Sequence, residues 1–259
     1  MRKYLYLLKL QIDLITNYKF DLYWRWIFSI GYMLFPIMIW KFSAENQAET
    51  KRIILYFFLF YGFISHTHTS RIAQNINQSI NSGDIKKFLI RPISYPIVEM
   101  INIISVILSR LIIPFFLIVI GVFIFPEYLA PSSFPNLLIS IVLVTIGIFV
   151  WNLILIAFSF LAFWVNEISS LVITIDLIFN FLKGYYVPAF LFPDLLRKSL
   201  VFTPIPYMIS YPIEIYQYGS STNEILKSIT ILIAWGIILI IFVKTIYKKG
   251  LKKYESFGA

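Results

Sequence analysis

Six polar residues inside apolar stretches are the first candidates for chemistry in this sequence. They are His66, His68, Arg71, Arg110, Asp176 and Asn180. His66 and His68 suggest a metal site, but two residues apart on a helix they point about 200° away from each other, whereas paired helical ligands usually stand four residues apart. We therefore expect no metal at this pair.

The charged members of this group need partners, because an unpaired charge in a bilayer costs about 2.5–3.5 kcal/mol on insertion scales. Arg110 stands roughly 20 Å along its helix from the end that we place in the cytoplasm below, and Asp176 roughly 12 Å, at 1.5 Å per residue. The long arginine side chain spans that difference. We hypothesise an Arg110–Asp176 pair that joins two spans. Separate pairing with backbone carbonyls or buried amides is the alternative.

The signatures of membrane-embedded catalysis are missing. The sequence has no H-E-x-x-H, no G-x-S-x-G, no aspartate pair on neighbouring spans and no carboxylate cluster for a metal diphosphate. It also lacks the phosphate-binding pattern G-x-x-x-x-G-K-[ST], so any ATP chemistry belongs to another chain. With no cysteine, thiolate metal sites and disulfides are excluded. We expect neither an enzyme nor a bound cofactor.

The composition is that of an integral membrane protein. Hydrophobic residues make up 59% of the 259 residues and charged residues 14%, against about 45–50% and 25% in soluble domains. The net charge of +9 does not indicate nucleic-acid binding, because the basic residues fall between apolar runs instead of clustering on a soluble face.

We expect one all-α transmembrane domain over residues 1–259 with six spans. The spans are expected at about 22–42, 53–80, 97–125, 136–164, 168–187 and 225–247. Residues 1–21 place Leu5, Leu8, Ile12 and Ile15 at helical spacing, which predicts an amphipathic helix along the membrane surface, with a solvated helix as the alternative.

Basic residues assign the sides of the membrane. Cytoplasmic loops carry an excess of Lys and Arg. Twelve of these residues fall in the N-terminal segment, the loop 82–94 and the C-terminal end with its tail 248–259, against seven on the opposite side. We therefore expect a multi-pass protein of the cell membrane with both termini in the cytoplasm.

The loop 82–94 contains a short stretch that predicts a docking helix of one to two turns. Gly83 permits a tight exit from the preceding helix and Pro92 stops the next one. Lys86, Lys87 and Arg91 stand opposite an apolar face of Ile85, Phe88 and Leu89, and Asp84 precedes them. The alternative is that the basic residues only mark a cytoplasmic loop.

Residues 188–218, called the outer segment below, are apolar but interrupted by proline. Pro188, Pro193, Pro204 and Pro206 stand among Phe190, Phe192 and other apolar residues. Such a segment survives at membrane depth only where protein or a cavity shields its backbone. We expect a re-entrant pair of short helices on the outer face. A partly folded external loop is the alternative.

Two stretches together carry a family resemblance. Residues 80–94, INSGDIKKFLIRPIS, resemble the I-x-x-G-x-I/L-x-x-x-L-x-R-P-x-S cytoplasmic loop of ABC-2-type permeases, in the branch with standalone six-span subunits. Residues 184–193, GYYVPAFLFP, with the later T-P-I-P at 203–206 and Y-P at 211–212, are similar to the region between the last two spans of that branch. Because both motifs stand in this order in a basic six-span chain with an N-terminal amphipathic helix, the resemblance extends over nearly the whole chain.

The resemblance implies a permease subunit of an ABC exporter. Such permeases pair with an identical or sibling permease and bind two cytoplasmic ATPase subunits, which hold the ATP and Mg²⁺. Gly83 to Pro92 would be the coupling helix that enters a groove on the ATPase. The proline-rich outer segment would cap the path of an amphiphilic or hydrophobic small molecule, lipid or peptide. Asp84-Ile85-Lys86-Lys87 departs from the family pattern by being more basic.

Two other classes of function remain as alternatives. An ion-coupled transporter or channel that acts without an ATPase would use intramembrane carboxylates or inverted repeats. The spans offer only Asp176 as a titrating carboxylate, and the sequence shows no repeat. The other class is a membrane enzyme or an assembly scaffold. An ATPase that copurifies with the chain would separate these classes.

Overall fold

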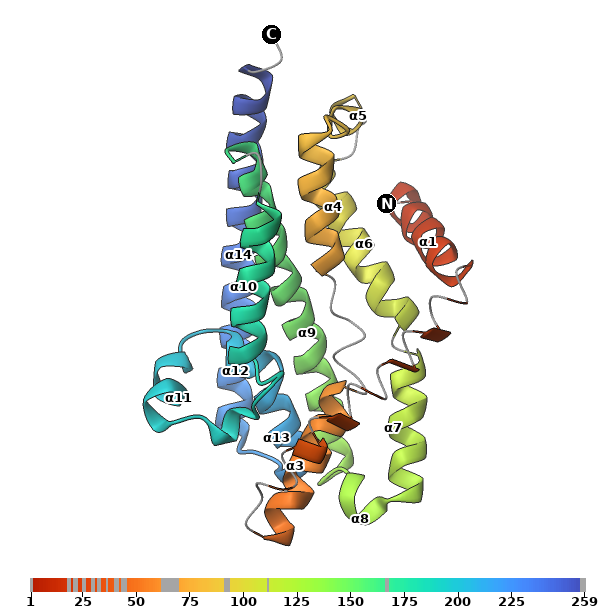
Figure 1. Ribbon diagram of the computed structural model, residues 1–259, viewed down its shortest axis with the longest axis vertical. Coiled ribbons are helices and arrows are strands. Elements are labelled where there is room, and N and C mark those ends of the chain that lie inside the picture. Colours follow the sequence, from red (N-terminus) through yellow and green to blue (C-terminus); the bar gives the residue numbers. More distant parts are fainter. Residues whose placement is uncertain are drawn as a thin grey trace.

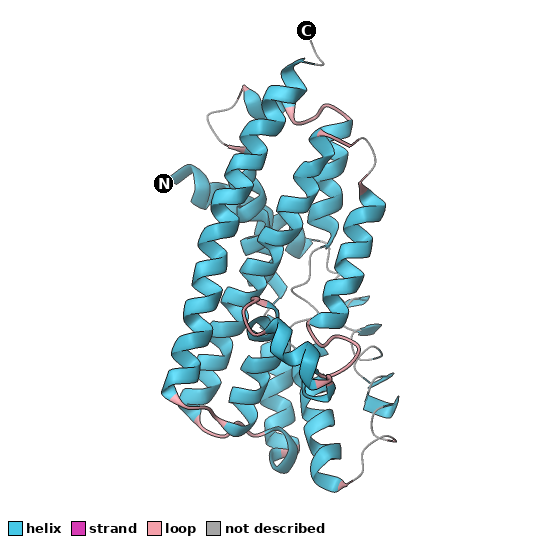
Figure 2. Ribbon diagram, turned by 90° about the vertical axis from the view of Figure 1, so that its left-hand side faces the viewer, coloured by secondary structure: helices cyan, strands magenta, loops and turns pink. Residues whose placement is uncertain are grey.

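The computed structural model describes residues 2–17, 46–61, 70–90, 94–110, 112–165 and 168–256, together with isolated positions between 20 and 42. Within these residues the regular structure is helical, and no strand occurs. Most of the longer helices run along the long axis of the molecule (Figure 1). Coloured by secondary structure, the described part shows helices joined by loops, which confirms the all-α part of the expected fold (Figure 2). The first expected span, 22–42, falls largely outside the described residues.

Two long helices form the centre of the molecule. Helix α9 (Phe134–Ser159) continues into the 3₁₀ turn η3 (Phe160–Phe163), and α14 runs over Thr222–Ser256. Among the described residues these are the two helices long and apolar enough to cross a membrane. They pack against each other along their lengths. The expected count of six spans stays a prediction.

The second and third expected spans each contain two helical segments. Residues 53–80 hold α3 (Gln47–Leu59) and α4 (Ser70–Asn81), and residues 62–69 between them lie outside the described part. The third span holds α6 (Tyr95–Arg110) and α7 (Ile112–Ile124), and residue 111 between them lies outside the described part.

The N-terminal residues form helix α1 (Arg2–Asn17), as the sequence predicts, and α1 packs against α6 (Figure 1). Leu8, Ile12 and Ile15 of the predicted apolar face are partly buried, whereas Leu5 is 60% exposed. One face of the helix thus contacts protein. A position along the membrane surface stays a prediction.

The fifth span and the outer segment differ from the expectation. Helix α10 (Ser169–Leu182) has 14 residues and a length of about 21 Å, less than the roughly 30 Å of a bilayer core. The outer segment holds four short helices instead of a pair: η4 (Ala189–Leu191), α11 (Asp194–Leu200), α12 (Ile205–Met208) and α13 (Ser210–Tyr218).

The prolines explain that division. Pro188, Pro193 and Pro204 each directly precede a short helix, and Pro206 lies within the first two positions of α12. These are the places where a fixed φ and a missing N–H cost least. The chain therefore restarts a helix at each proline and cannot continue the previous one.

The two ends of the molecule carry different connections. The one-turn helix α5 (Lys86–Leu89) and the C-terminus lie at one end, which we call the α5 end, and α8 (Pro126–Leu129) lies at the other, the α8 end (Figure 1). The basic loop and the basic C-terminal residues thus share one end, as the charge pattern predicts. Residues 248–256, which belong to the expected tail 248–259, continue α14.

Candidate functional site

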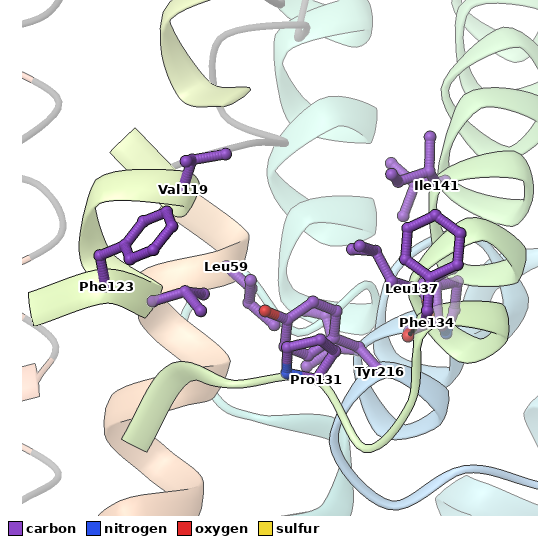
Figure 3. Close-up of a pocket in the computed structure, with 13 residues that line it drawn as sticks. Leu59, Val119, Phe123, Pro131, Phe134, Leu137, Ile141 and Tyr216 are labelled. Atoms are coloured by element: carbon purple, nitrogen blue, oxygen red, sulfur yellow. Dashed lines mark hydrogen bonds between the residues drawn. The ribbon is translucent and has the colours of Figure 1, made fainter. Parts of the chain in front are cut away.

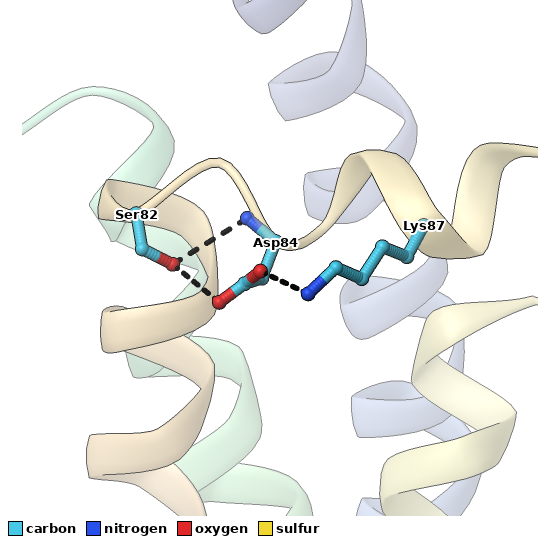
Figure 4. Close-up of polar contacts among 3 residues, drawn as sticks. All are labelled: Ser82, Asp84 and Lys87. Carbon is cyan, nitrogen blue, oxygen red and sulfur yellow. Dashed lines mark hydrogen bonds and ion pairs between the residues drawn. The ribbon is translucent and has the colours of Figure 1, made fainter.

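Hydrogen bonds between residues close in sequence hold the loop before α5 in one conformation (Figure 4). The Asp84 carboxylate accepts from Lys87 Nζ at 2.5 Å and from Ser82 Oγ at 2.9 Å, and Ser82 Oγ also accepts from the Asp84 N–H at 3.4 Å. The hydrogen bond from Lys87, and after it the one from Ser82, lowers the pKa of Asp84 below its ordinary value. The loop thus presents charged groups in one arrangement.

The backbone of this loop is anchored by one apolar residue. Gly83 has φ 83°, a left-handed conformation that glycine adopts without strain. Two residues later the Ile85 N–H donates to the Ser79 carbonyl at 3.0 Å, and the Ile85 side chain is fully buried. Lys86 and Lys87 remain exposed. The turn therefore has a buried side and a basic outer side, as the sequence predicts.

Six aromatic side chains lie beneath the loop and link it to the two long helices. This aromatic cluster comprises Phe88, Tyr95, Phe160, Phe163, Tyr247 and Tyr254. The ring centroids of Phe88 and Tyr95 are 4.7 Å apart, and those of Tyr95 and Phe160 are 6.3 Å apart. Phe160 stands 5.3 Å from Tyr247 of α14. Offset and edge contacts at such distances are favourable.

Tyr254 brings the end of α14 up to the loop. Its ring centroid lies 6.1 Å from that of Phe163 and 5.9 Å from the Lys86 ammonium nitrogen. Of the predicted coupling residues, Asp84, Lys86 and Lys87 are exposed and Phe88 joins the aromatic cluster. Arg91, Pro92 and the Leu89 side chain lie outside the described part. Sequence reasoning missed Tyr254, because it stands far along the chain from the loop.

Hydroxyl groups connect α3 to the turn that follows α10. The buried Tyr56 hydroxyl donates to the Gly184 carbonyl at 3.2 Å and lies 3.3 Å from Ser210 Oγ, which donates to the Lys183 carbonyl at 3.2 Å. Tyr61 Oη donates to the Tyr185 carbonyl at 3.1 Å. These bonds satisfy the carbonyls of the three residues that directly follow α10.

Arg52 on α3 makes a second connection to the outer segment. Its guanidinium carbon lies 3.8 Å from the Phe190 ring centroid and 5.6 Å from that of Tyr218, and its Nη2 lies 3.5 Å from Glu214 Oε1. Burial raises the pKa of Glu214, and the neighbouring Arg52 and Arg197 oppose that shift. We call Arg52, Phe190 and Glu214 the Arg52 clamp.

The later part of the outer segment packs on the long helices. Ser140 Oγ of α9 donates to the Pro212 carbonyl at 2.8 Å, and Trp235 Nε1 of α14 donates to the Phe202 carbonyl at 3.0 Å. Phe192 stacks on Phe181 of α10 with centroids 5.7 Å apart. Phe190 and Phe192, aromatic residues of the segment that is predicted to cap the path, thus hold it to α3 and α10.

The predicted intramembrane polar residues are only partly described. Asn180 Nδ2 donates to Asp176 Oδ2 at 3.2 Å. Residues 66 and 68 and the side chains of Arg71 and Arg110 lie outside the described part, so the Arg110–Asp176 pair stays a prediction. The described residues contain no group of three or more potential metal ligands.

Lys183 adds a buried cation that sequence reasoning assigned to the outer side. Its side chain is 3% exposed, and its Nζ lies 3.4 Å from the Trp151 ring centroid, at the distance of a close cation–π contact. Counting basic residues assigns a lysine to one side of the membrane and does not show whether it is buried. The Lys183 side chain packs against α9 through Trp151.

Comparison with known families agrees with this arrangement. The family described as ABC-2 family transporter protein matches residues 29–258. That range holds the loop before α5, the aromatic cluster and the outer segment. A search of curated proteins found no match. Because the family match covers nearly the whole chain, the protein belongs to the ABC-2 transporter family and is a membrane-embedded permease of the ABC-2 type.

Proposed function

We propose that this chain is the permease subunit of an ABC exporter. It pairs with a second permease, identical or sibling, and two separate cytoplasmic ATPase subunits drive it with ATP and Mg²⁺. The observation that carries this proposal is the basic turn at α5, which is exposed on its outer side and rests on the aromatic cluster on its inner side. With this assignment the α5 end faces the cytoplasm.

The aromatic cluster can transmit a movement of α5, caused by the ATPase, to the two long helices. A push on α5 reaches Phe88 and Tyr95, then Phe160 at the end of α9 and Tyr247 on α14. Close-packed side chains and rigid helices transmit displacement because the interior has little free space to absorb it. The two long helices thus move with the turn.

The other ends of the same helices hold the outer segment. Ser140 of α9 bonds the Pro212 carbonyl, and Trp235 of α14 bonds the Phe202 carbonyl. Movement of α9 against α14 therefore shifts the outer segment and changes access to the path between permeases. ATP biases this equilibrium only to the extent that it binds one conformation more tightly than the other.

The cargo class that fits best is amphiphilic or hydrophobic. The spans are apolar, and helices α7, α10 and α14 expose large apolar side chains along their length. Contact with such a surface removes hydrocarbon from water, which is favourable, and the surface offers few hydrogen bonds to a polar solute. A lipid, a peptide with an apolar face or an apolar small molecule meets these conditions.

The experiment is to purify the chain from its native source and to measure ATPase copurification and ATP-driven transport. The double variant Lys86→Glu/Lys87→Glu is expected to lose ATPase binding while it still inserts in the membrane. Lys227→Glu makes the same kind of charge change on an exposed residue near the start of α14, at the opposite end, and should bind normally. A chain that arrives alone and transports without ATP would overturn the proposal in favour of an ion-coupled transporter.

A further inference from the structure

A cavity of about 480 Å³ opens at the α8 end between α7, α9 and α13 (Figure 3). Val119 and Phe123 of α7 form one wall, and Phe134, Leu137 and Ile141 of α9 form the opposite wall. Tyr216 of α13 lies at its floor together with the loop that precedes α9. The cavity is thus shared by two apolar helices and the outer segment.

The walls offer hydrocarbon contact and no free hydrogen bond. The hydroxyl of Tyr216 donates to the Leu129 carbonyl at 2.6 Å, and the hydroxyl of Ser140 donates to the carbonyls of Asn136 at 2.7 Å and Pro212 at 2.8 Å. A bound water needs two to four polar partners, which these walls lack. Contact between an apolar occupant and the same walls is favourable, so the cavity suits a hydrocarbon chain better than water.

The height of the cavity fits one half of a bilayer. Its lining on α9 extends from Phe134 to Val144, a distance of roughly 15 Å at 1.5 Å per residue. The hydrocarbon core of a bilayer is about 30 Å thick, so one leaflet contributes about half of that. The stretch lies in the first part of α9, a helix long and apolar enough to cross a membrane, so we place it in the leaflet at the α8 end.

We propose that this cavity binds one acyl chain of a membrane phospholipid from the leaflet at the α8 end. The occupant contacts Tyr216 and Ile213 of α13, so it also supports the outer segment from the membrane side. The bilayer supplies this ligand at the required depth. The binding does not depend on the proposed transport function, because it needs neither an ATPase nor a cargo.

The test uses the full chain in nanodiscs that contain a phospholipid with a photoreactive diazirine near the end of one acyl chain. After irradiation, peptide mapping by mass spectrometry locates the adducts. We expect adducts on the α9 and α13 residues that line the cavity, and one tightly retained phospholipid per chain in native mass spectrometry. Adducts spread over all exposed helix faces in proportion to exposure would overturn the proposal.

Two adjacent substitutions provide a matched comparison. Ile141→Trp places a larger ring in the cavity, whereas Val142→Trp adds the same side chain at the neighbouring position of α9, which is 50% exposed and outside the lining. Ile141→Trp takes up space that the acyl chain needs and should reduce cavity adducts roughly tenfold. Val142→Trp should leave them unchanged. Equal labelling of both variants would contradict the assignment.

A second variant guards against misfolding of Ile141→Trp. Val119→Phe narrows the cavity from the α7 wall, and gel filtration with thermal unfolding shows whether each variant is folded. A folded Val119→Phe protein should also lose the retained phospholipid. If both folded variants keep it, or if the retained compound is not a phospholipid, the proposal is wrong. None of these readouts measures transport, so their failure is separate from failure of the proposed function.

Discussion

Gly83 in the turn before α5 and Tyr254 near the end of α14 stand in close contact: a Cβ added at Gly83 would lie 3.3 Å from the Tyr254 hydroxyl. The two residues are separated by most of the chain, yet they bring the candidate docking turn against the longest helix. The contact requires both the absent side chain at position 83 and the continuation of α14 beyond the membrane. The first two predictions follow from it.

Gly83→Ala is expected to lower stability and to impair ATPase docking. The left-handed backbone at φ 83° costs an L-residue roughly 1–2 kcal/mol, and the new methyl group crowds Tyr254. Thermal unfolding in detergent measures the first effect and ATPase copurification the second. Gly236→Ala is the control, because its Cβ meets only Val150 at an ordinary 3.7 Å and alanine favours the helix. Equal stability of the two variants would contradict this account.

Tyr254→Ala should uncouple ATP hydrolysis from transport without preventing ATPase binding. The substitution removes the ring that contacts Phe163 and Lys86 and leaves the exposed basic face of α5 in place. The ratio of transported cargo to hydrolysed ATP measures the effect. Tyr254→Phe keeps the ring and should retain coupling. Loss in both variants would point to the hydroxyl instead of the aromatic contact.

The Arg52 clamp predicts an order among three substitutions in the free energy of unfolding. Arg52→Ala removes both the ion pair and the ring contact and should cost about 1–2 kcal/mol, because a cation–π pair contributes about 0.5–1 and a partly exposed ion pair up to about 1. Phe190→Leu and Glu214→Gln should each cost less. A double-mutant cycle of Arg52 with Phe190 measures the coupling, and a coupling near zero would exclude the clamp.

Gly147→Ala should detach α12 from α9. A Cβ at Gly147 would lie 2.6 Å from the Met208 Cα, and backbone atoms cannot turn away as a flexible side chain can. Overpacking of this kind costs about 1–3 kcal/mol. Thr145→Ala, at an exposed position of the same helix, is the control. Limited proteolysis of the outer segment should become faster only in Gly147→Ala, and unchanged cleavage would show that the packing is not required.

Asp84 predicts how the turn responds to pH. Its pKa in the folded protein is lowered from 3.8 by the hydrogen bonds from Lys87 and Ser82. A lowered pKa stabilises the fold above the unfolded value, and this contribution is lost as pH falls through the folded value. ATPase copurification should therefore not change between about pH 8 and pH 5 on account of Asp84. Asp84→Asn should weaken it across that whole range. A pH-dependent loss confined to the wild-type chain would contradict the assignment.

Local patterns in the sequence were sufficient where one stretch of chain decides its own structure. The apolar run at 136–164 has no proline and appears as α9 with η3, which begin two residues earlier than predicted. Gly83, the basic residues opposite an apolar face, and Pro92 predict a helix of one to two turns, and α5 has one turn. Each depends on contacts within a few residues, which a sequence displays directly.

Hydropathy does not locate the end of a helix that leaves the membrane. The lysines after residue 247 mark the predicted cytoplasmic tail, but lysine is a good helix former, and α14 continues through them to Ser256. In the outer segment the prolines place the starts of η4, α11 and α12, and the packing on α9 and α14 decides how these short helices lie.

The tertiary structure alone decided which distant residues meet. Nothing in the spacing of Phe88, Phe160 and Tyr254 relates them, yet they join one aromatic cluster. Lys183 and Arg52 were counted among the seven basic residues on the outer side, and the structure adds that both lie over aromatic rings. Counting charges assigns a loop to one side of the membrane. Whether a side chain in that loop is buried depends on the helices that pack beside it. The sequence therefore determined the class of this protein and its charged turn, and packing decided what the turn rests on.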